Sequence, residues 1–305
     1  MATPTLLAVP NVSEGRDARV IEDIGRAFAG SARLLDVHHD RDHHRSVFTL
    51  AGRQGELADA LLAGAAAAVA QLDVVGSGAP EERGGQHPHV GAIDVVPVVY
   101  LDEAARGAAC AEALVVAERI GAELGVPVFL YGELTSDGGR QQRTRAQLRR
   151  GGVAALAQKM RGDGEPPLHP DFGPPAIHPR AGATLVAARA PLVAFNLQLA
   201  APATLADARA IAALIREGGS EGLPGVRAIG VGLTGGVAQV SMNIERPLEL
   251  PLATVLEAVS RHAPVASGEL VGLAPGSALK GFPPHIPLLG FDPARQLIEK
   301  ALGWL

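Results

Sequence analysis

The chain has 305 residues, of which 47% are hydrophobic and 19% charged, with a formal net charge of −5. This balance is typical of a packed globular protein and lacks the basic footprint of a nucleic-acid-binding protein, so no nucleic-acid partner is expected. The single cysteine, Cys110, excludes an intrachain disulfide and favours a reducing, cytoplasmic location. The N-terminal residues do not resemble a signal peptide, and the apolar run 60–72 is too short for a membrane span.

The first half of the chain alternates between buried-strand and helical patterns. In chain order it predicts a strand over 5–9, a helix over 20–30 capped by Ser13 or Asp17, strands over 33–38 and 46–52, a helix over 54–73, a loop over 76–91, a strand over 92–101, a helix over about 103–124 and a strand over 126–132. Helical spacing returns at about 142–160, and a proline- and glycine-rich stretch follows over 163–183.

The second half repeats the pattern of the first. After a strand-like ATLVAAR segment it predicts a strand over 193–200, a helix over 205–218, a hairpin of strands over 227–233 and 237–244, a helix over 252–263 and a strand over 267–274. This β-α-β-β-α-β order, found in both halves, is that of the ferredoxin-like motif. We therefore expect an α+β protein of two tandem ferredoxin-like subdomains, 1–181 and 182–305, with a small-molecule groove between them.

The segment QHPHVGAID contains the first candidate for chemistry. His87 follows a glycine-rich loop and precedes a buried strand, and its side chain titrates near neutral pH, as a general acid–base group must. Asp94, at the start of that strand, could orient the imidazole. The alternative is a surface-loop histidine that is hydrogen-bonded to the backbone.

A second candidate is the run HHDRDHHR at 38–45, which suggests a metal site. Adjacent side chains on a strand point in opposite directions, so few of these groups could converge on one ion. No HExxH motif or cysteine cluster accompanies them. We therefore expect no metal, and interpret the run as a polar turn between strands.

The proline-rich loop over 170–182 is the third candidate. His178, Arg180 and the backbone N–H groups could bind a planar heterocycle and a carboxylate tail, and arginine is the natural partner of a carboxylate. Arg180 could equally be an ordinary surface charge. The chain has neither of the glycine-rich nucleotide-binding fingerprints.

Several of these segments, in this order, resemble the glutamate formiminotransferase family. They are VPNVSEGRD (9–17), LLDV with RSVFTLAG (34–52), HPHVGAIDVVPVV (87–99), VPVFLYGE (126–133), PDFGPP (170–175), GATLVAARAPLVAFNLQL (182–199), VAQVSMNI (237–244) and GELVGLAP (268–275). Together they span residues 5–280, which is nearly the whole chain.

The resemblance implies a homodimer of two-subdomain chains that transfers the formimino group of N-formimino-L-glutamate to N5 of tetrahydrofolate in histidine catabolism. His87 corresponds to the family's catalytic histidine, and 173–182 to its folate-binding loop. That loop comprises Gly173, Pro174, Pro175, Ala176, Ile177, His178, Pro179, Arg180, Ala181 and Gly182. The residues expected to contact the donor substrate are Asn11, His38, His44, Arg45 and His89. We therefore expect no fused cyclodeaminase portion, which would not fit in 305 residues.

Two positions depart from the family pattern. His89 stands where the family has arginine, and His38 where it has an acid. If the chain uses the family substrate, we expect a protonated His89 to supply the missing positive charge. Two alternatives remain: a folate-binding paralogue with another donor or no turnover, and a metal hydrolase that uses the histidine run.

Overall fold

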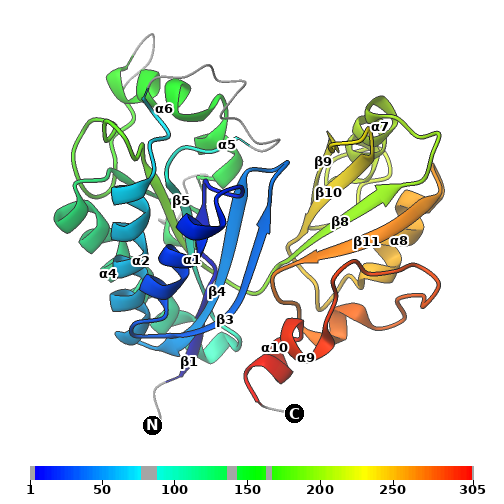
Figure 1. Cartoon of the computed structure of the whole chain (residues 1–305), viewed down its shortest axis with the longest axis horizontal. Helices are drawn as coiled ribbons and strands as arrows, with labels where there is room; N and C mark the ends of the chain where they lie inside the picture. The colour runs from blue at the N-terminus through cyan, green and yellow to red at the C-terminus, as the bar shows by residue number, and fades with distance from the viewer. Residues whose placement is uncertain (1–3, 77–87, 136–142, 163–166, 304–305) are drawn as a thin grey trace. The chain divides into compact units, whose positions relative to one another are not determined.

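The computed structural model describes residues 4–76, 88–135, 143–162 and 167–303 (Figure 1). The protein is a mixed α+β structure with two sheets, which confirms the predicted α+β class. The chain folds as two compact units, Met1–Ala190 and Pro191–Leu305. This division falls later than the predicted boundary at 181/182, because residues Thr184–Arg189 form a strand in the sheet of the first unit.

The sheet of the first unit has the strand order β1-β4-β2-β5-β7-β6, with β3 paired to β4. Its strands are β1 (Thr5–Ala8), β2 (Asn11–Val12), β3 (Arg33–Asp40), β4 (Arg45–Arg53), β5 (Ile93–Val99), β6 (Val128–Leu130) and β7 (Thr184–Arg189). The predicted strand 5–9 is thus continued by β2 after a break at Pro10, which has no N–H for the ladder. The strands β1 to β5 pair antiparallel, whereas β7 is parallel to both β5 and β6.

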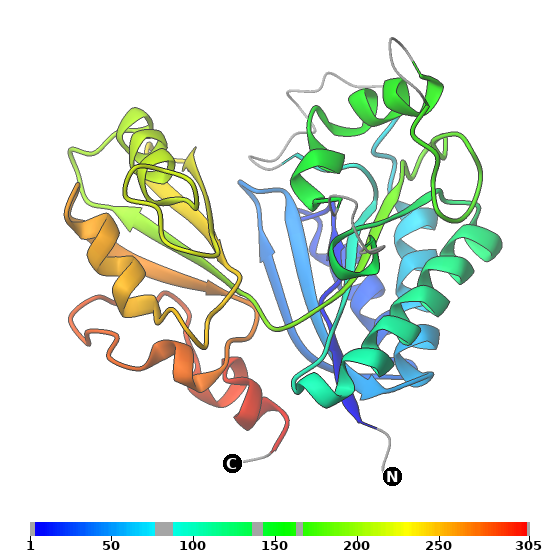
Figure 2. The same ribbon diagram turned by 180° about the vertical axis from the view of Figure 1, so that it is seen from behind.

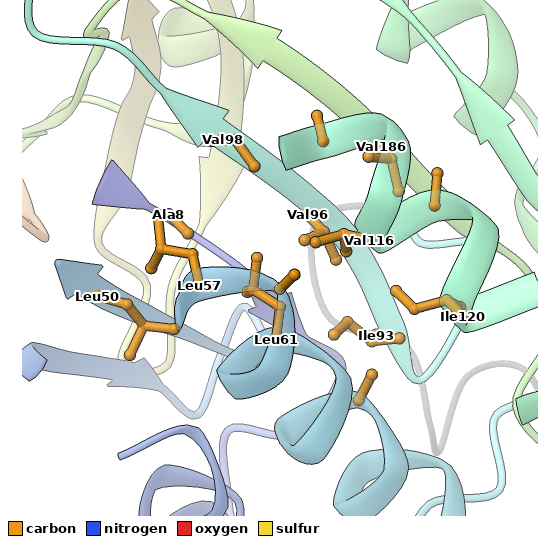
Figure 3. Close-up of a cluster of buried hydrophobic side chains, with 14 of the residues drawn as sticks. Ala8, Leu50, Leu57, Leu61, Ile93, Val96, Val98, Val116, Ile120 and Val186 are labelled. Carbon is orange, nitrogen blue, oxygen red and sulfur yellow. The ribbon is translucent and has the colours of Figure 1, made fainter. Parts of the chain in front are cut away.

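Three long helices cover one face of this sheet: α1 (Ala18–Phe28), α2 (Glu56–Gln71) and α4 (Arg106–Leu124) (Figures 1 and 2). Asp17 caps α1, as predicted, by accepting from two backbone N–H groups. Figure 3 shows the core beneath the helices, where Leu57 and Leu61 of α2 and Ile120 of α4 point toward the strands. Alanines along α2 let it lie close to α1 and α4, so a core with few aromatic residues still packs densely.

The opposite face of the sheet carries a smaller core beneath α5 (Arg145–Arg149) and α6 (Gly152–Arg161). Leu148 and Leu156 pack there against residues of β5, β6 and β7. The predicted helix over 142–160 is divided into these two because Gly151 and Gly152 both have positive φ values, 80° and 66°. This break ends α5 at Arg149, immediately above the sheet.

The second unit has a four-stranded antiparallel sheet with the order β11-β8-β10-β9. Its elements are β8 (Val193–Leu199), α7 (Leu205–Ile215), β9 (Val226–Gly232), β10 (Ala238–Ile244), α8 (Leu252–Ser260) and β11 (Val265–Val271). Both helices pack on one face of the sheet around Phe195, Leu197 and Val240 (Figure 2). The short helices α9 (Pro293–Gln296) and α10 (Ile298–Ala301) follow.

Candidate functional site

A buried carboxylate with two arginine partners lies where β4, β5 and α5 meet. Asp94, the second residue of β5, is fully buried. Its Oδ1 accepts from the backbone N–H of Val90 at 2.9 Å, and its Oδ2 accepts from the guanidinium of Arg45 at 3.1 Å and from that of Arg149. We call Arg45, Asp94 and Arg149 the arginine–aspartate cluster. Asp94 therefore lies in a buried polar site, and its role in orienting His87 stays a prediction.

The charge state of Asp94 is set by these partners. Burial alone raises the pKa of this carboxyl, but the guanidinium groups of Arg149 and Arg45, together with the N–H of Val90, hold the pKa below its usual range. Burial and the neighbouring Arg149 lower the pKa of Arg45 to about 9, so Arg45 stays charged at neutral pH. The cluster therefore contains two positive charges and one negative charge.

Arg149 is the member of the cluster that the sequence analysis did not single out. It ends α5 and is buried, with only 7% of its surface exposed, and its Nε has no hydrogen-bond partner within the part of the chain that the structure describes. In the sequence it is one arginine among several in TRAQLRR. The one sequence feature that indicates a position facing the sheet is its location between Leu148 and the pair Gly151–Gly152.

His89 lies next to the cluster and is half-buried. Burial lowers the pKa of its imidazole, Asp94 opposes this shift, and the positive charges of Arg45 and Arg149 reinforce it. This direction favours the neutral imidazole at pH 7, and the expectation that a protonated His89 replaces the family's arginine stays a prediction. Arg45 and Arg149 supply further positive charge beside it.

His44, in the turn between β3 and β4, has a structural contact. Its Nδ1 accepts from the backbone N–H of Gly15 at 3.1 Å and lies 3.6 Å from a carboxylate oxygen of Glu14. Burial lowers the pKa of His44, against the opposing effect of Glu14. Gly15 is required here because a Cβ would lie 2.1 Å from the carbonyl oxygen of Asp40. These contacts fix the turn that precedes Arg45.

Asn11 and His38 lie at the same end of β4 as Arg45. Both pair with Val47, Asn11 from β2 and His38 from β3. The side-chain amide of Asn11 donates to the carbonyl of Val9 at 3.0 Å. The predicted substrate residues of the first unit are therefore gathered around the beginning of one strand, although a substrate-binding role for them stays a prediction.

The loop 173–182 is fixed to the sheet at its N-terminal end. Asp171 accepts from the backbone N–H of Leu130 at 2.7 Å and from the guanidinium of Arg143 at 2.6 Å. Phe172 forms a β-bridge with Val128. Gly173 follows with a φ of 82°, and a Cβ there would lie 2.7 Å from the carbonyl oxygen of Val126. The exposed residues Pro174, Pro175 and Ala176 thus extend from a rigid base.

The C-terminal end of the loop closes on itself. His178 and Gly182 exchange backbone hydrogen bonds of 3.0 and 3.1 Å, and the Nδ1 of His178 accepts from the N–H groups of Arg180 and Ala181. The imidazole of His178 therefore stabilises a turn, and burial together with Arg180 lowers its pKa. Arg180 is exposed, and its guanidinium has no ion-pair partner among the described residues. Of the two side chains proposed as donors, Arg180 is the one left available.

His87 lies outside the described residues, so its position and its relation to Asp94 stay predictions. The adjacent residues are well placed: Gly91 bridges Gly182, and a Cβ on Gly91 would lie 1.9 Å from the carbonyl oxygen of Ala183. The chain that leaves the His87 loop therefore lies directly against the end of the loop 173–182. Gly91 is thus adjacent to the end of the loop 173–182 in the structure.

The described ranges, 4–76, 88–135, 143–162 and 167–303, contain neither a metal-binding cluster nor a membrane-spanning helix. No group of three or more His, Cys, Asp or Glu side chains there could hold a metal ion. No helix in those ranges is both long and apolar enough to cross a membrane.

Residues 5–189 match the model described as the formiminotransferase domain, N-terminal subdomain, which places the first unit among formiminotransferase domains. Because the match covers more than half of the chain, the chain belongs to the formiminotransferase family.

Curated relatives cover the rest of the chain as well. The chain is 34% identical to the glutamate formimidoyltransferase of Streptococcus pyogenes serotype M1, over 96% of this chain and 97% of that protein. It is 32% identical to the glutamate formimidoyltransferase of Thermoplasma acidophilum, over 96% of this chain and 95% of that protein. It is 39% identical to the formimidoyltransferase-cyclodeaminase of Sus scrofa, of which it spans only 50%. The chain thus spans about half the length of the cyclodeaminase relatives.

Proposed function

We propose that the protein is a folate-dependent one-carbon transferase that moves the formimino group of N-formimino-L-glutamate to N5 of tetrahydrofolate in histidine catabolism. The observation that carries this proposal is the similarity to two glutamate formimidoyltransferases along almost the full length of both chains. The agreement extends to the second unit, beyond the segment that the family model matches.

His87 is proposed as the acid–base group. Tetrahydrofolate, the co-substrate, supplies N5 as the nucleophile, and glutamate leaves from the formimino carbon. His87 takes the proton that N5 loses and delivers it to the departing glutamate nitrogen, so that one group serves both halves of the transfer. Asp94 helps to hold this region in place through Val90, and no metal is required in this scheme.

The loop 173–182 is proposed to bind tetrahydrofolate. Its anchored ends and exposed centre suit a surface that is formed before the ligand arrives, which reduces the entropic cost of binding. Arg180 provides a free guanidinium for a carboxylate of the folate tail. Asn11, His38, His44 and Arg45 are proposed to form the adjoining donor site.

The finer architecture is proposed to be two ferredoxin-like subdomains in a cytoplasmic homodimer. The strand order of the second unit, β11-β8-β10-β9, is 4-1-3-2 when its strands are numbered in chain order, and its elements follow the βαββαβ order. In the first unit β5, β1 with β2, β4 and β3 have the same relation, and β7 and β6 extend the sheet beyond β5.

A turnover assay with tetrahydrofolate and N-formimino-L-glutamate tests the proposal. We expect stoichiometric formation of formiminotetrahydrofolate and glutamate. The matched control is N-formyl-L-glutamate, in which an oxygen replaces the transferred imino nitrogen. If tetrahydrofolate binds but the formimino group is never transferred, the chain is a folate-binding paralogue, and the replacement of the family's arginine and acid by His89 and His38 would explain the loss.

A further inference from the structure

We propose that Arg149, together with Arg45, binds a carboxylate of the formimino donor, so that the arginine–aspartate cluster selects an acidic donor. The inference rests on the proposed function for the identity of the donor. It assigns a binding role to a residue from α5, far in sequence from the other predicted site residues.

The charge of the cluster is the first argument. Asp94 uses both oxygens on Val90, Arg45 and Arg149, so it cannot neutralise two guanidinium groups. One positive charge is left over in a place where Asp94 is fully buried and Arg149 nearly so. An unbalanced buried charge is costly, and an anionic ligand would remove that cost.

Unused hydrogen-bond donors are the second argument. A guanidinium has five N–H donors in a planar fork. Arg149 uses one nitrogen on Asp94, and its buried Nε has no acceptor among the described residues. A carboxylate is the group whose geometry matches such a fork. The neutral state of His89 adds no competing anion or cation.

Access to the cluster is the third argument. Arg45 also donates to the carbonyl oxygen of Pro88 at 3.4 Å, and Pro88 is exposed. The cluster therefore lies just below the surface beside Pro88, the residue that follows the proposed acid–base group His87 in the sequence. A carboxylate bound there would place the rest of a small donor next to the reaction centre.

Direct binding measurements by calorimetry test this inference without requiring turnover. The ligands are N-formimino-L-glutamate and its two monoamides, one lacking the side-chain carboxylate and one lacking the α-carboxylate. We expect the wild-type protein to bind one monoamide roughly 10- to 100-fold more weakly than the diacid. We expect Arg149→Gln to weaken diacid binding by a similar factor and to leave the affinity for that monoamide unchanged.

Three controls separate the alternatives. Arg119→Gln removes an arginine of α4 that pairs with Asp59 and Glu123, and should change no affinity. Arg149→Lys keeps the charge, so it should fold and bind the diacid with intermediate affinity. Tetrahydropteroate, which lacks the glutamate tail, distinguishes the folate carboxylates from those of the donor.

Equal binding of the diacid and both monoamides by the wild type overturns the inference, even if Arg149→Gln fails to fold. A loss of affinity in Arg149→Gln for tetrahydrofolate, but not for the donor, overturns it in favour of the folate tail. If Arg149→Gln loses the diacid selectivity of the wild type and the wild type never transfers the group, the proposed function fails and the inference stands.

Discussion

At the residue scale, Asp94 shows what local sequence reveals and what it hides. Its position at the start of a buried strand after a histidine loop predicts a site residue. Its partners Arg45 and Arg149 lie 49 and 55 residues away, and no local pattern connects them. A fully buried carboxylate requires positively charged partners, so the burial of Asp94 implies that such partners exist. It does not indicate which residues they are.

The proposed acid–base role of His87 predicts that its removal lowers kcat but does not change the affinity for tetrahydrofolate. His87→Ala should lower kcat by at least roughly 10²-fold, because acid–base catalysis contributes that much or more. Tetrahydrofolate affinity should stay close to the wild-type value, since the residue moves protons and supplies little contact area. Steady-state kinetics together with a binding titration would show this. A variant that keeps more than about a tenth of the wild-type kcat would exclude the role.

The imidazole of His89 leads to a prediction about acid stability. Its pKa is lowered from the usual 6.5 in the folded protein by burial, with Asp94 opposing and Arg45, Arg149 and His44 reinforcing the shift. Below pH 6.5 the unfolded chain therefore binds a proton that the folded chain does not, and stability falls as the pH falls from 6.5 toward the folded pKa. His89→Gln should reduce this loss of Tm between pH 7 and pH 5.

Thermal unfolding at several pH values measures the effect. His44 and His178 also have lowered pKa values, so the slope should shrink without disappearing. His39→Gln is the control, because His39 is an exposed histidine of β3. A pH dependence that is identical in the wild type and in His89→Gln would show that His89 is not buried as described.

At the element scale, the loop 173–182 is defined by its anchors. The proline-rich composition predicted an ordered binding loop, and the structure gives the reason: Asp171 and Phe172 fix one end, and the turn at His178–Gly182 fixes the other. The sequence did not predict that His178 stabilises the turn. A histidine that accepts from backbone N–H groups cannot be distinguished by sequence from one that binds a ligand.

Arg180 allows a test of the loop's proposed role. Arg180→Gln should weaken tetrahydrofolate binding roughly 10-fold, because it removes one charge-assisted hydrogen bond and breaks no ion pair among the described residues. The same substitution should leave the affinity for tetrahydropteroate unchanged, since that ligand lacks the carboxylates. Fluorescence or calorimetric titration of both ligands measures the difference. Equal losses for the two ligands would mean that Arg180 shapes the loop instead.

The start of α2 depends on a carboxylate from another helix. Gly55, at the N-cap, has no side chain, and the buried Glu112 of α4 accepts from the N–H of Gly55 at 2.8 Å and from that of Ala58 at 2.7 Å. Glu112→Gln should lower the free energy of unfolding by about 1–3 kcal/mol, because an amide offers one acceptor where the carboxylate offers two. Urea unfolding of this variant and of Glu118→Gln, an exposed site on the same helix, would show whether only the first is destabilised.

At the scale of the whole molecule, hydrophobic periodicity predicted the α+β class and nearly every element of the two units. Hydrophobic periodicity did not predict the parallel pairing of β7 with β5 and β6. It indicates that β7 is a strand, but it does not specify which strands lie beside β7. The predicted boundary at 181/182 therefore divided the chain before the last strand of the first unit. The groove expected between the subdomains stays a prediction.

The position of β7 has a consequence for how the protein is made. β7 is the last strand of the first unit to leave the ribosome, yet it lies between β5 and β6 in the sheet. Until residue 189 has been synthesised, β5 and β6 are not connected in one sheet, because β7 is the strand that pairs with both. Long-range parallel pairing of this kind forms slowly. The loop 173–182 directly precedes β7 and is fixed by bridges to the same part of the sheet. A nascent chain that ends before β7 would thus carry almost every site residue and no assembled site.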